Sequence, residues 1–366
     1  MDALVRGDGR APVSGPTMAS TSLRIRRADL RADEGAIRAL LARNLPAAAS
    51  ERRYAWLYLG NPEGPALVWI AEDAASGEPV GTSAAHAREV RVDGRPFRAL
   101  NLSDFAVDAA HRSLGPALQL LRATLEPVRA GEFAFSYDLP SRSMAAIYKR
   151  LGGLDLGPMV RLALPLAAAP VIRRRLGEGI AARLLGAVGD LALGARDLFR
   201  TAPRGVDVGE CEGEWGSELD RLDAALALSC RVRAARGSRQ LRWRFGPGAA
   251  GSPVLLLARR AGEPVGFAIA RELEPGVHSI ADFGALDATV GRALVHGLVA
   301  RARAADAVAL SAQTLRASPV TALLVEAGLT PRGEGPGPVV VAHASAPTPI
   351  LAAGANWCIL DGDGDV

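Results

Sequence analysis

The second half of this 366-residue chain repeats the first half in outline. The pentapeptide Gly-Glu-Pro-Val-Gly occurs at positions 77–81 and again at 262–266. Five pairs recur in the same order: Trp56 and Trp243, Gly77 and Gly262, Asp104 and Asp282, Gly115 and Gly291, Ser143 and Ser318. Their spacing falls steadily along the chain, which an ancestral duplication with small deletions in the second copy predicts and chance matches do not. We therefore expect two tandem copies of one fold.

Length and repeat together set the expected boundaries, because a chain of this size exceeds the roughly 100–200 residues of one typical domain. We predict a disordered leader at 1–22, a first domain at 23–165, a helical linker at 166–205, a second domain at 206–346 and a tail at 347–366. The linker is rich in Ala, Leu and Arg with a helical period. We expect it to pack between the domains, the alternative being a basic amphipathic helix on a membrane surface.

Composition narrows the class of protein. A hydrophobic content of 49% and a charged content of 22% are typical of a globular chain. The net charge is only +4, Lys149 is the one lysine, and no basic block alternates with aromatics, so nucleic acid is not a favoured partner. Three scattered cysteines without a CxxC pair argue against zinc and for a reducing compartment. We expect a cytoplasmic protein without a transmembrane segment.

Strand and helix patterns alternate along the first copy. Strands are expected near 23–25, 66–71, 80–85, 98–107, 132–137 and 159–164. Helices are expected from Asp33, Pro116 and Ser141, the latter two ending near Gly131 and Gly152. This alternation predicts an α/β fold.

The segment 112–117, Arg-Ser-Leu-Gly-Pro-Ala, carries the first chemical signal. It lies between a predicted strand and a predicted helix, where loop N–H groups and a helix N-terminus can hold an anion. Pro116 lacks an N–H and so removes one donor, although proline suits the first helical turn. This arrangement fits a pyrophosphate.

The strand, loop and helix with Arg-x-x-Gly-x-Ala resemble the acyl-coenzyme A motif of the GNAT superfamily of N-acyltransferases, over roughly 23–165. The resemblance implies two tandem GNAT-like domains, each a mixed, mostly antiparallel sheet flanked by helices. It also implies acetyl-CoA or another acyl-CoA as co-substrate, no metal, and a strand at 104–107 that pairs with the pantetheine arm. The implied coenzyme contacts are Phe105, Ala106, Val107, Arg112, Ser113, Leu114, Gly115, Pro116, Ala117 and Ser143.

The segment from Ser141 to Gly152 resembles the closing helix of that family, in which a tyrosine points at the coenzyme sulfur. The resemblance makes Tyr148 the general acid that protonates the leaving thiolate. A general base must also take a proton from the incoming ammonium group. Asp104 on the central strand is the first candidate and Glu89 the second. Because Asp282 recurs at the matching place in the second copy, Asp104 serves either the reaction or the fold.

The second copy has lost this equipment. Ala288 stands where the repeat places Arg112, and Leu323 stands where it places Tyr148. Asp287 adds negative charge where a pyrophosphate would have to sit. We therefore predict an acyl-CoA-dependent N-acyltransferase that acts on a small-molecule or peptide amine, with its site in the first copy. The alternative is a non-catalytic acyl-CoA-binding or scaffold protein.

Two further features, a pair of tryptophans and the acidic tail, are expected to serve the fold rather than the chemistry. Trp56 and Trp243 are expected to anchor helices to the sheet rather than to shape acceptor pockets. The tail with Asp361, Asp363 and Asp365 lacks the Glu ligand of a calcium loop, so we expect no metal there. We expect this acidic end either to be solvated or to fold back against an Arg-rich surface.

Overall fold

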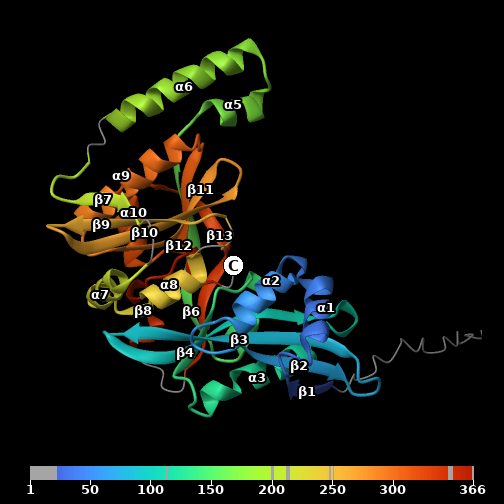
Figure 1. The fold of residues 1–366 in the computed structure, drawn as a ribbon. Helices are drawn as coiled ribbons and strands as arrows, with labels where there is room; N and C mark the ends of the chain where they lie inside the picture. Colours follow the sequence, from blue (N-terminus) through green and yellow to red (C-terminus); the bar gives the residue numbers. More distant parts are fainter. Residues whose placement is uncertain are drawn as a thin grey trace, which may run out of the picture.

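Figure 1 shows a computed structural model that describes residues 23–112, 114–198, 202–211, 215–246, 249, 251–344 and 349–364. Within these residues one sheet of 13 strands runs through the whole molecule, flanked by helices. The strand order is β1-β2-β3-β4-β5-β13-β6-β12-β11-β10-β9-β7, and β8 pairs with β3 off this path. Most neighbouring strands are antiparallel. The predicted class, a mixed and mostly antiparallel sheet flanked by helices, is confirmed.

The first half follows the predicted order of elements. It comprises β1 (Leu23–Arg27), α1 (Glu34–Asn44), α2 (Glu51–Arg53) continuing into a π-helical turn (Tyr54–Leu59), β2 (Leu67–Asp73), β3 (Pro79–Val92), β4 (Arg95–Val107), α3 (Leu114–Arg129), β5 (Phe135–Asp138), α4 (Arg142–Arg150) and β6 (Leu154–Pro165). Strand β3 is longer than expected, because its end pairs with a strand of the second half, β8 (Val232–Ala234).

From its third strand to its last, the second half repeats the succession that the first half shows from β2 to β6. It comprises β7 (Asp207–Glu210), α7 (Ser217–Leu226), β8, α8 (Ser238–Phe245), β9 (Val254–Arg260), β10 (Glu263–Glu274), β11 (Val277–Ala285), α9 (Ala288–Ala304), β12 (Ala309–Leu315), α10 (Pro319–Glu326) and β13 (Thr330–Ala344), followed by the short α11 (Pro349–Ala352). Three strands, a helix, a strand, a helix and a strand therefore occur in each half.

The two halves exchange their last strands. Strand β13 pairs antiparallel with β5 of the first half, and β6 pairs antiparallel with β12 of the second half. The two exchanged strands also pair with each other. The central third of the sheet is therefore built from both halves, and neither half completes its own sheet without the other.

The sheet has an apolar layer on each face in the first half. Ala85 of β3 belongs to a cluster with residues of α3 and α4, whereas its neighbour Ala84 belongs to a cluster with α1 and the π-helical turn. Successive residues of a strand point to opposite faces, so these clusters lie on opposite sides of the sheet.

Trp56 and Trp243 join the two halves. The indole Nε1 of Trp56 donates a hydrogen bond to the carbonyl oxygen of Trp243 at 2.9 Å, and Trp243 returns the same bond to Trp56 at 3.1 Å. The two rings stack with centroids 5.3 Å apart. The tryptophans therefore do anchor helices, but they anchor them to each other across the two halves.

The tail folds back into the molecule. Asp363 is 2% exposed and accepts a hydrogen bond from Arg236 at 2.6 Å, and Trp357 packs against Phe135 and Tyr137 of the first half. Asp365 lies outside the described residues. Of the two expected arrangements, the solvated end is wrong. The packing of Trp357 against Phe135 and Tyr137, together with the ion pair between Asp363 and Arg236, keeps this segment buried.

A disulfide between Cys230 and Cys358 ties the tail to the second half. The sequence did not predict this pairing, because the two residues are 128 positions apart and nothing in their local sequence links them. Cys211 is the free cysteine.

The linker forms two antiparallel helices, α5 (Ala169–Leu176) and α6 (Ile180–Leu198). Figure 1 places this hairpin at the outer end of the second half, beyond α9 and β11 and far from the first half. The expectation that it packs between the domains is therefore wrong. None of the helices in the described residues combines the length and the apolar content needed to cross a membrane.

We predict that the disulfide stabilises the fold through the long loop that it closes. Because that loop spans 128 residues, replacing Cys230 and Cys358 by Ala should lower the free energy of unfolding by about 5 kcal/mol. Urea unfolding with and without dithiothreitol measures this, and Cys211→Ala is the matched control that should change little. Equal unfolding midpoints for the oxidised and reduced chain would contradict the prediction.

Candidate functional site

Strands β4 and β5 separate in the middle of the first half. They pair in parallel only where Ala99, Leu100 and Asn101 face residues 135–137. Beyond Asn101, β4 continues to Val107, and no described strand pairs with it on the β5 side. Half of the main-chain N–H and C=O groups in this stretch therefore point away from any strand partner and can bind an extended ligand.

A β-bulge interrupts this free stretch. Thr82 faces Ala106 and Ala84 faces Ser103, so that two residues of β4, Asp104 and Phe105, stand opposite one residue of β3. Asp104 has a φ of 48°, in the left-handed region. A bulge re-aims side chains and bends the strand, a device common beside functional sites.

The structure places the predicted coenzyme contacts around the end of this strand. Phe105, Ala106 and Val107 form its last residues, and Gly115, Pro116 and Ala117 lie in the first turn of α3. Leu114 begins that helix, and Ser113 lies outside the described residues. Open space surrounds the Gly115 Cα, since a Cβ built there would meet nothing within 4 Å.

Arg112 stands exposed just before α3 with its charge uncompensated. Its Nε donates to the carbonyl oxygen of Val107 at 3.3 Å, and its Nη2 donates to Asn44 Oδ1 at 3.2 Å. No carboxylate in the described part of the chain pairs with it. These neutral partners position the guanidinium near the helix N-terminus, where the partial positive charge of the helix dipole also favours an anion.

Tyr148 is held by a carboxylate that the sequence did not single out. Its ring is 1% exposed, and its hydroxyl donates to Asp138 Oδ2 at 2.7 Å. Asp138 is the last residue of β5, directly before the turn that leads to Ser141, the N-cap of α4. The Ser143 hydroxyl lies 3.0 Å from that of Ser141, at the start of the same helix. The sequence signal that could have identified Asp138 is an acidic residue at the end of a strand, ten positions before the tyrosine.

Asp104 is saturated with hydrogen bonds. Its carboxylate accepts two bonds from Arg53, at 2.8 and 3.1 Å, and one from the Tyr58 hydroxyl at 2.7 Å. Burial and the nearby Asp104 charge raise the pKa of Tyr58 well above its usual value. Of the two roles that the sequence left open for Asp104, these contacts favour support of the fold.

The base candidates are not brought together with Tyr148. Tyr148 belongs to the apolar cluster on the α3 and α4 face, whereas Tyr58, which bonds Asp104, belongs to the cluster on the opposite face. Glu89 lies six residues along β3 from Ser83, which is roughly 20 Å in an extended strand. There it pairs with Arg91 at 3.2 Å, close to β8.

A buried histidine accompanies Asp104, and the sequence did not indicate it. The Nε2 of His86 lies 2.8 Å from the Ser103 hydroxyl, and its ring packs edge-on against Tyr58. Burial, which disfavours the imidazolium, lowers the pKa of His86 to about 4. The side chain is therefore neutral near pH 7.

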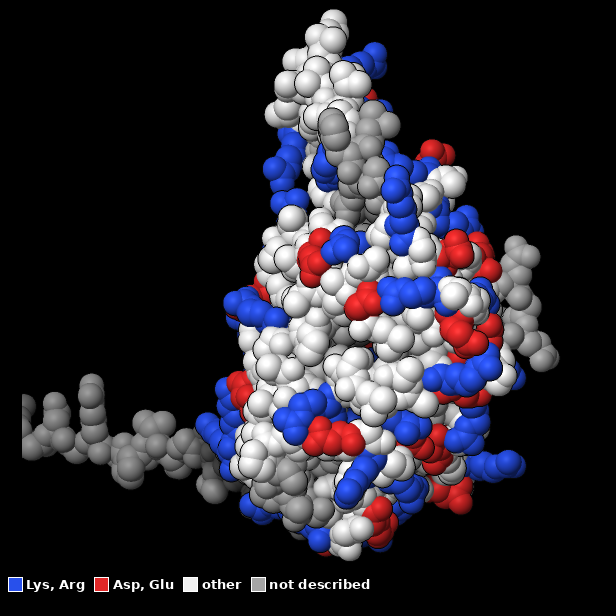
Figure 2. Space-filling view, turned by 90° about the vertical axis from the view of Figure 1, so that its left-hand side faces the viewer, with Lys and Arg blue, Asp and Glu red and all other residues white. Residues whose placement is uncertain are grey.

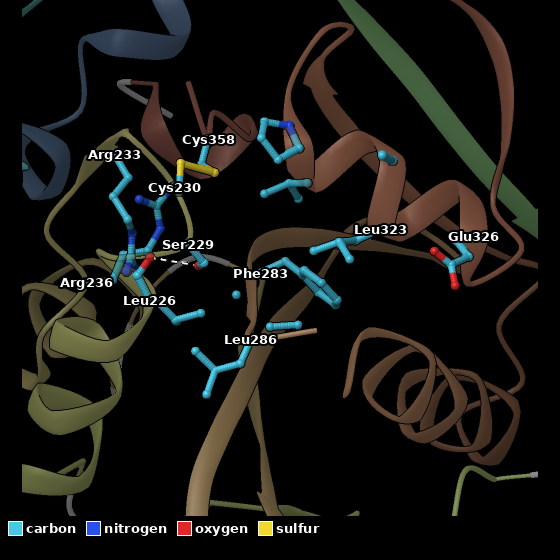
Figure 3. A pocket seen from close by; sticks show the side chains of 15 residues that line it. Leu226, Ser229, Cys230, Arg233, Arg236, Phe283, Leu286, Leu323, Glu326 and Cys358 are labelled. Carbon is cyan, nitrogen blue, oxygen red and sulfur yellow. Dashed lines mark hydrogen bonds between the residues drawn. A yellow bond between two sulfur atoms is a disulfide. The ribbon is translucent and has the colours of Figure 1, made fainter. Parts of the chain in front are cut away.

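The second half has a cavity of about 290 Å³ where its strands separate, between the end of β11 and α10. Figure 3 shows Phe283, Leu286 and Leu323 beside this space, with the disulfide at its edge. Two buried arginines reach its wall, but Asp223 pairs with Arg233, and Asp282 and Asp363 pair with Arg236. The cavity is thus largely apolar and offers no uncompensated cation from these two side chains.

The N-terminus of α9 is capped by its own carboxylate. Asp287 Oδ1 accepts the N–H of Val290 at 2.9 Å, and Oδ2 pairs with Arg260 at the same distance. A carboxylate therefore occupies the position that an anionic ligand would need. This agrees with the loss expected from Asp287 and Ala288 in the sequence.

The overall fold is that of the GNAT proteins. An Anabaena variabilis GCN5-related N-acetyltransferase superposes with a TM-score of 0.62 at 12% identity, covering 88% of this chain and 73% of that one. A conserved Enterococcus faecalis protein described as a probable N-acyltransferase gives 0.59 at 12% identity, with 87% and 72% covered. Saccharomyces cerevisiae N-myristoyltransferase with bound myristoyl-CoA gives 0.53 at 11% identity, with 93% and 84% covered.

The family follows from the sequence itself. Residues 24–153 match the model of the acetyltransferase (GNAT) domain, a range that runs from β1 to the end of α4. These residues therefore form a GNAT acetyltransferase domain, as the resemblance implied. No curated protein is similar enough in sequence to count as a match.

We predict that Asp104 contributes to stability. Asp104→Asn leaves Arg53 without its full charge partner and should lower the free energy of unfolding by about 3 kcal/mol. The same chemical change at the more exposed Glu89, Glu89→Gln, should cost less than about 1 kcal/mol. Urea unfolding measures both. An Asp104→Asn chain that keeps its stability and loses all acyl transfer would show instead that Asp104 is the general base.

We predict a pH-dependent stability from His86. Its pKa is about 4 in the folded chain and roughly 6.5 when unfolded, so between these values the unfolded chain binds more protons. The contribution of the neutral, buried His86 to the free energy of unfolding is complete above pH ~6.5. It is lost as the pH falls toward ~4, by up to about 3 kcal/mol. His86→Gln should remove this part of the decline when unfolding free energies are compared between pH 4 and 7. Identical slopes for the two proteins would show that His86 titrates normally.

Proposed function

We propose that this chain is an acyl-CoA-dependent N-acyltransferase with its active site in the first half. It transfers an acyl group, most simply acetyl, from coenzyme A to the primary amine of a small molecule or peptide. The observation that carries the proposal is the combination of an uncompensated Arg112 before α3 with a carboxylate-held Tyr148 on α4. Tyr148 packs in the same apolar cluster as Leu102 and Val107, which lie in the stretch of β4 that has no strand partner on its β5 side.

The binding part of the proposal follows from charge. The coenzyme pyrophosphate carries negative charge, and the first turn of α3 offers N–H groups and the positive end of a helix dipole. Arg112 adds charge-assisted hydrogen bonds, which are about twice as strong as neutral ones. The free edge of β4 would pair with the amides of the pantetheine arm.

The chemical part requires one proton to move from nitrogen to sulfur. The amine nitrogen attacks the thioester carbonyl carbon, the C–N bond forms, and the C–S bond breaks. The departing thiolate takes the proton of the Tyr148 hydroxyl. The ammonium nitrogen loses two protons in becoming an amide: the first leaves to the base or to water before the attack, and the second reprotonates the Tyr148 phenolate. In the free protein that hydroxyl points at Asp138, so the bound sulfur must compete with Asp138 for the proton.

The third part of the proposal concerns the base that accepts the ammonium proton. The Asp104 carboxylate is engaged by Arg53 and Tyr58, and Glu89 lies far along β3. This favours transfer through water over direct contact with either carboxylate. It is also the observation that favours the second candidate function, a non-catalytic acyl-CoA-binding or scaffold protein.

We predict that Arg112 is needed for coenzyme binding and that Tyr148 is needed for the chemical step. Arg112→Glu should weaken acetyl-CoA binding in calorimetry at least about tenfold, because it replaces a phosphate ligand by a like charge. Arg95→Glu makes the same charge change at the far end of β4 and should leave the affinity unchanged.

Tyr148→Phe should keep the affinity and lower kcat about 100-fold or more, measured as release of the coenzyme thiol with a panel of primary amines. Unchanged turnover in Tyr148→Phe would remove the tyrosine from the mechanism. Acetyl-CoA binding without turnover of any amine would support the non-catalytic alternative, and absence of binding would refute both.

A further inference from the structure

The α5–α6 hairpin is joined to the body of the molecule at its base. Leu166 and Ala167 donate main-chain hydrogen bonds to the Val308 carbonyl oxygen, and Arg196 Nη2 donates to that of Pro165 at 2.9 Å. From there the two helices project past the end of the sheet (Figure 1). Their packing and charge do not enter the proposed function.

Three small residues of α6, Ala182, Gly186 and Gly189, face α5. A Cβ on Gly186 would lie 2.9 Å from Ala169, and one on Gly189 would lie 2.6 Å from Ala168, so the helices approach too closely for larger side chains. Ala182, one turn earlier on this face, is buried. Asp190 accepts the main-chain N–H groups of Ala168 and Ala169 at the start of α5. These contacts fix the rotation of α6 about its own axis.

The largest residues of α6 consequently point outward. Ile180, Leu184, Val188 and Leu191 follow one another at spacings of four, four and three, which aligns them along one face of the helix, and Leu185 flanks them. Their exposed fractions lie between 53% and 78%. With Val171 and Leu176 of α5, the hairpin holds seven of the twelve large exposed apolar side chains in the described residues. Such a concentration marks an interaction surface, whereas single exposed apolar residues do not.

Cations accompany this apolar stripe. Arg173, Arg174 and Arg175 lie at the end of α5, and Arg183 lies in the first turn of α6. All four are exposed. None of the four has a carboxylate partner within the described part of the chain. Asp190, by contrast, is occupied by the start of α5. Figure 2 shows this end of the molecule as a white surface bordered by blue side chains.

We propose that the α5–α6 hairpin docks on an anionic lipid bilayer, with the α6 stripe in the acyl-chain boundary and the arginines among the headgroups. Aliphatic side chains gain by leaving water, and each arginine near an anionic surface is attracted to it. Long arginine side chains can reach headgroups while their stems cover apolar surface. Pairing with a second copy is disfavoured, because it would bring two sets of unpaired arginines together.

Flotation of the full chain with vesicles tests this. The chain should float with vesicles of phosphatidylglycerol and phosphatidylcholine, and not with phosphatidylcholine alone. The triple change Leu184→Ser, Val188→Ser, Leu191→Ser should lower the bound fraction at least tenfold. The triple change Arg173→Ala, Arg174→Ala, Arg175→Ala should lower the partition coefficient by about fivefold per arginine. Leu228→Ser, at an exposed leucine elsewhere in the second half, is the control that should bind normally.

Two results would overturn the proposal. One is failure of the native chain to float with the anionic vesicles. The other is flotation that the triple serine variant leaves unchanged. If the native chain does not float but forms a dimer in light scattering that the serine variant loses, the stripe is a contact between two copies. Circular dichroism of each variant confirms that the helices are intact before either result is counted.

Discussion

The exchange of β6 and β13 is the constraint on which the rest of this structure depends. Each strand fills a place in the other half, so the central hydrogen-bond ladders form only when both halves are folded and aligned. The reciprocal Trp56 and Trp243 bonds and the buried tail reinforce the same junction. The exchange also gives the second half a structural part in the first, because the sheet next to α4 includes β13.

The two halves differ in chemistry at positions that the fold makes equivalent. At the start of α3, the guanidinium of Arg112 has only neutral partners, whereas at the start of α9 the carboxylate of Asp287 caps the helix itself. One arrangement attracts an anion and the other already contains one. On the closing helices, a hydroxyl held by Asp138 contrasts with the aliphatic Leu323 beside an apolar cavity. Similar backbones thus carry an acyl-CoA site in one half, on our proposal, and a mainly structural role in the other.

Local patterns in the sequence predicted the order of elements and the position of Arg112 and Tyr148, because strand alternation, helix caps and a Gly-containing loop act over a few residues. Contacts between distant residues could not be predicted in this way. The pairing of Cys230 with Cys358, the bonds of Arg53 and Tyr58 to Asp104, and the exchange of β6 with β13 join positions far apart in the chain. The apolar stripe of α6 was visible as a helical period, but the side that it faces depends on how Gly186 and Gly189 pack against α5.

The central claim is that one half of a strand-exchanged pair binds acyl-CoA and the other does not. The number of acetyl-CoA molecules bound per chain in a calorimetric titration of the intact protein tests this most directly. We predict one molecule per chain, at a site whose occupancy survives Asp287→Ala in the second half unchanged. Two molecules per chain, or one that depends on the second half, would contradict the account.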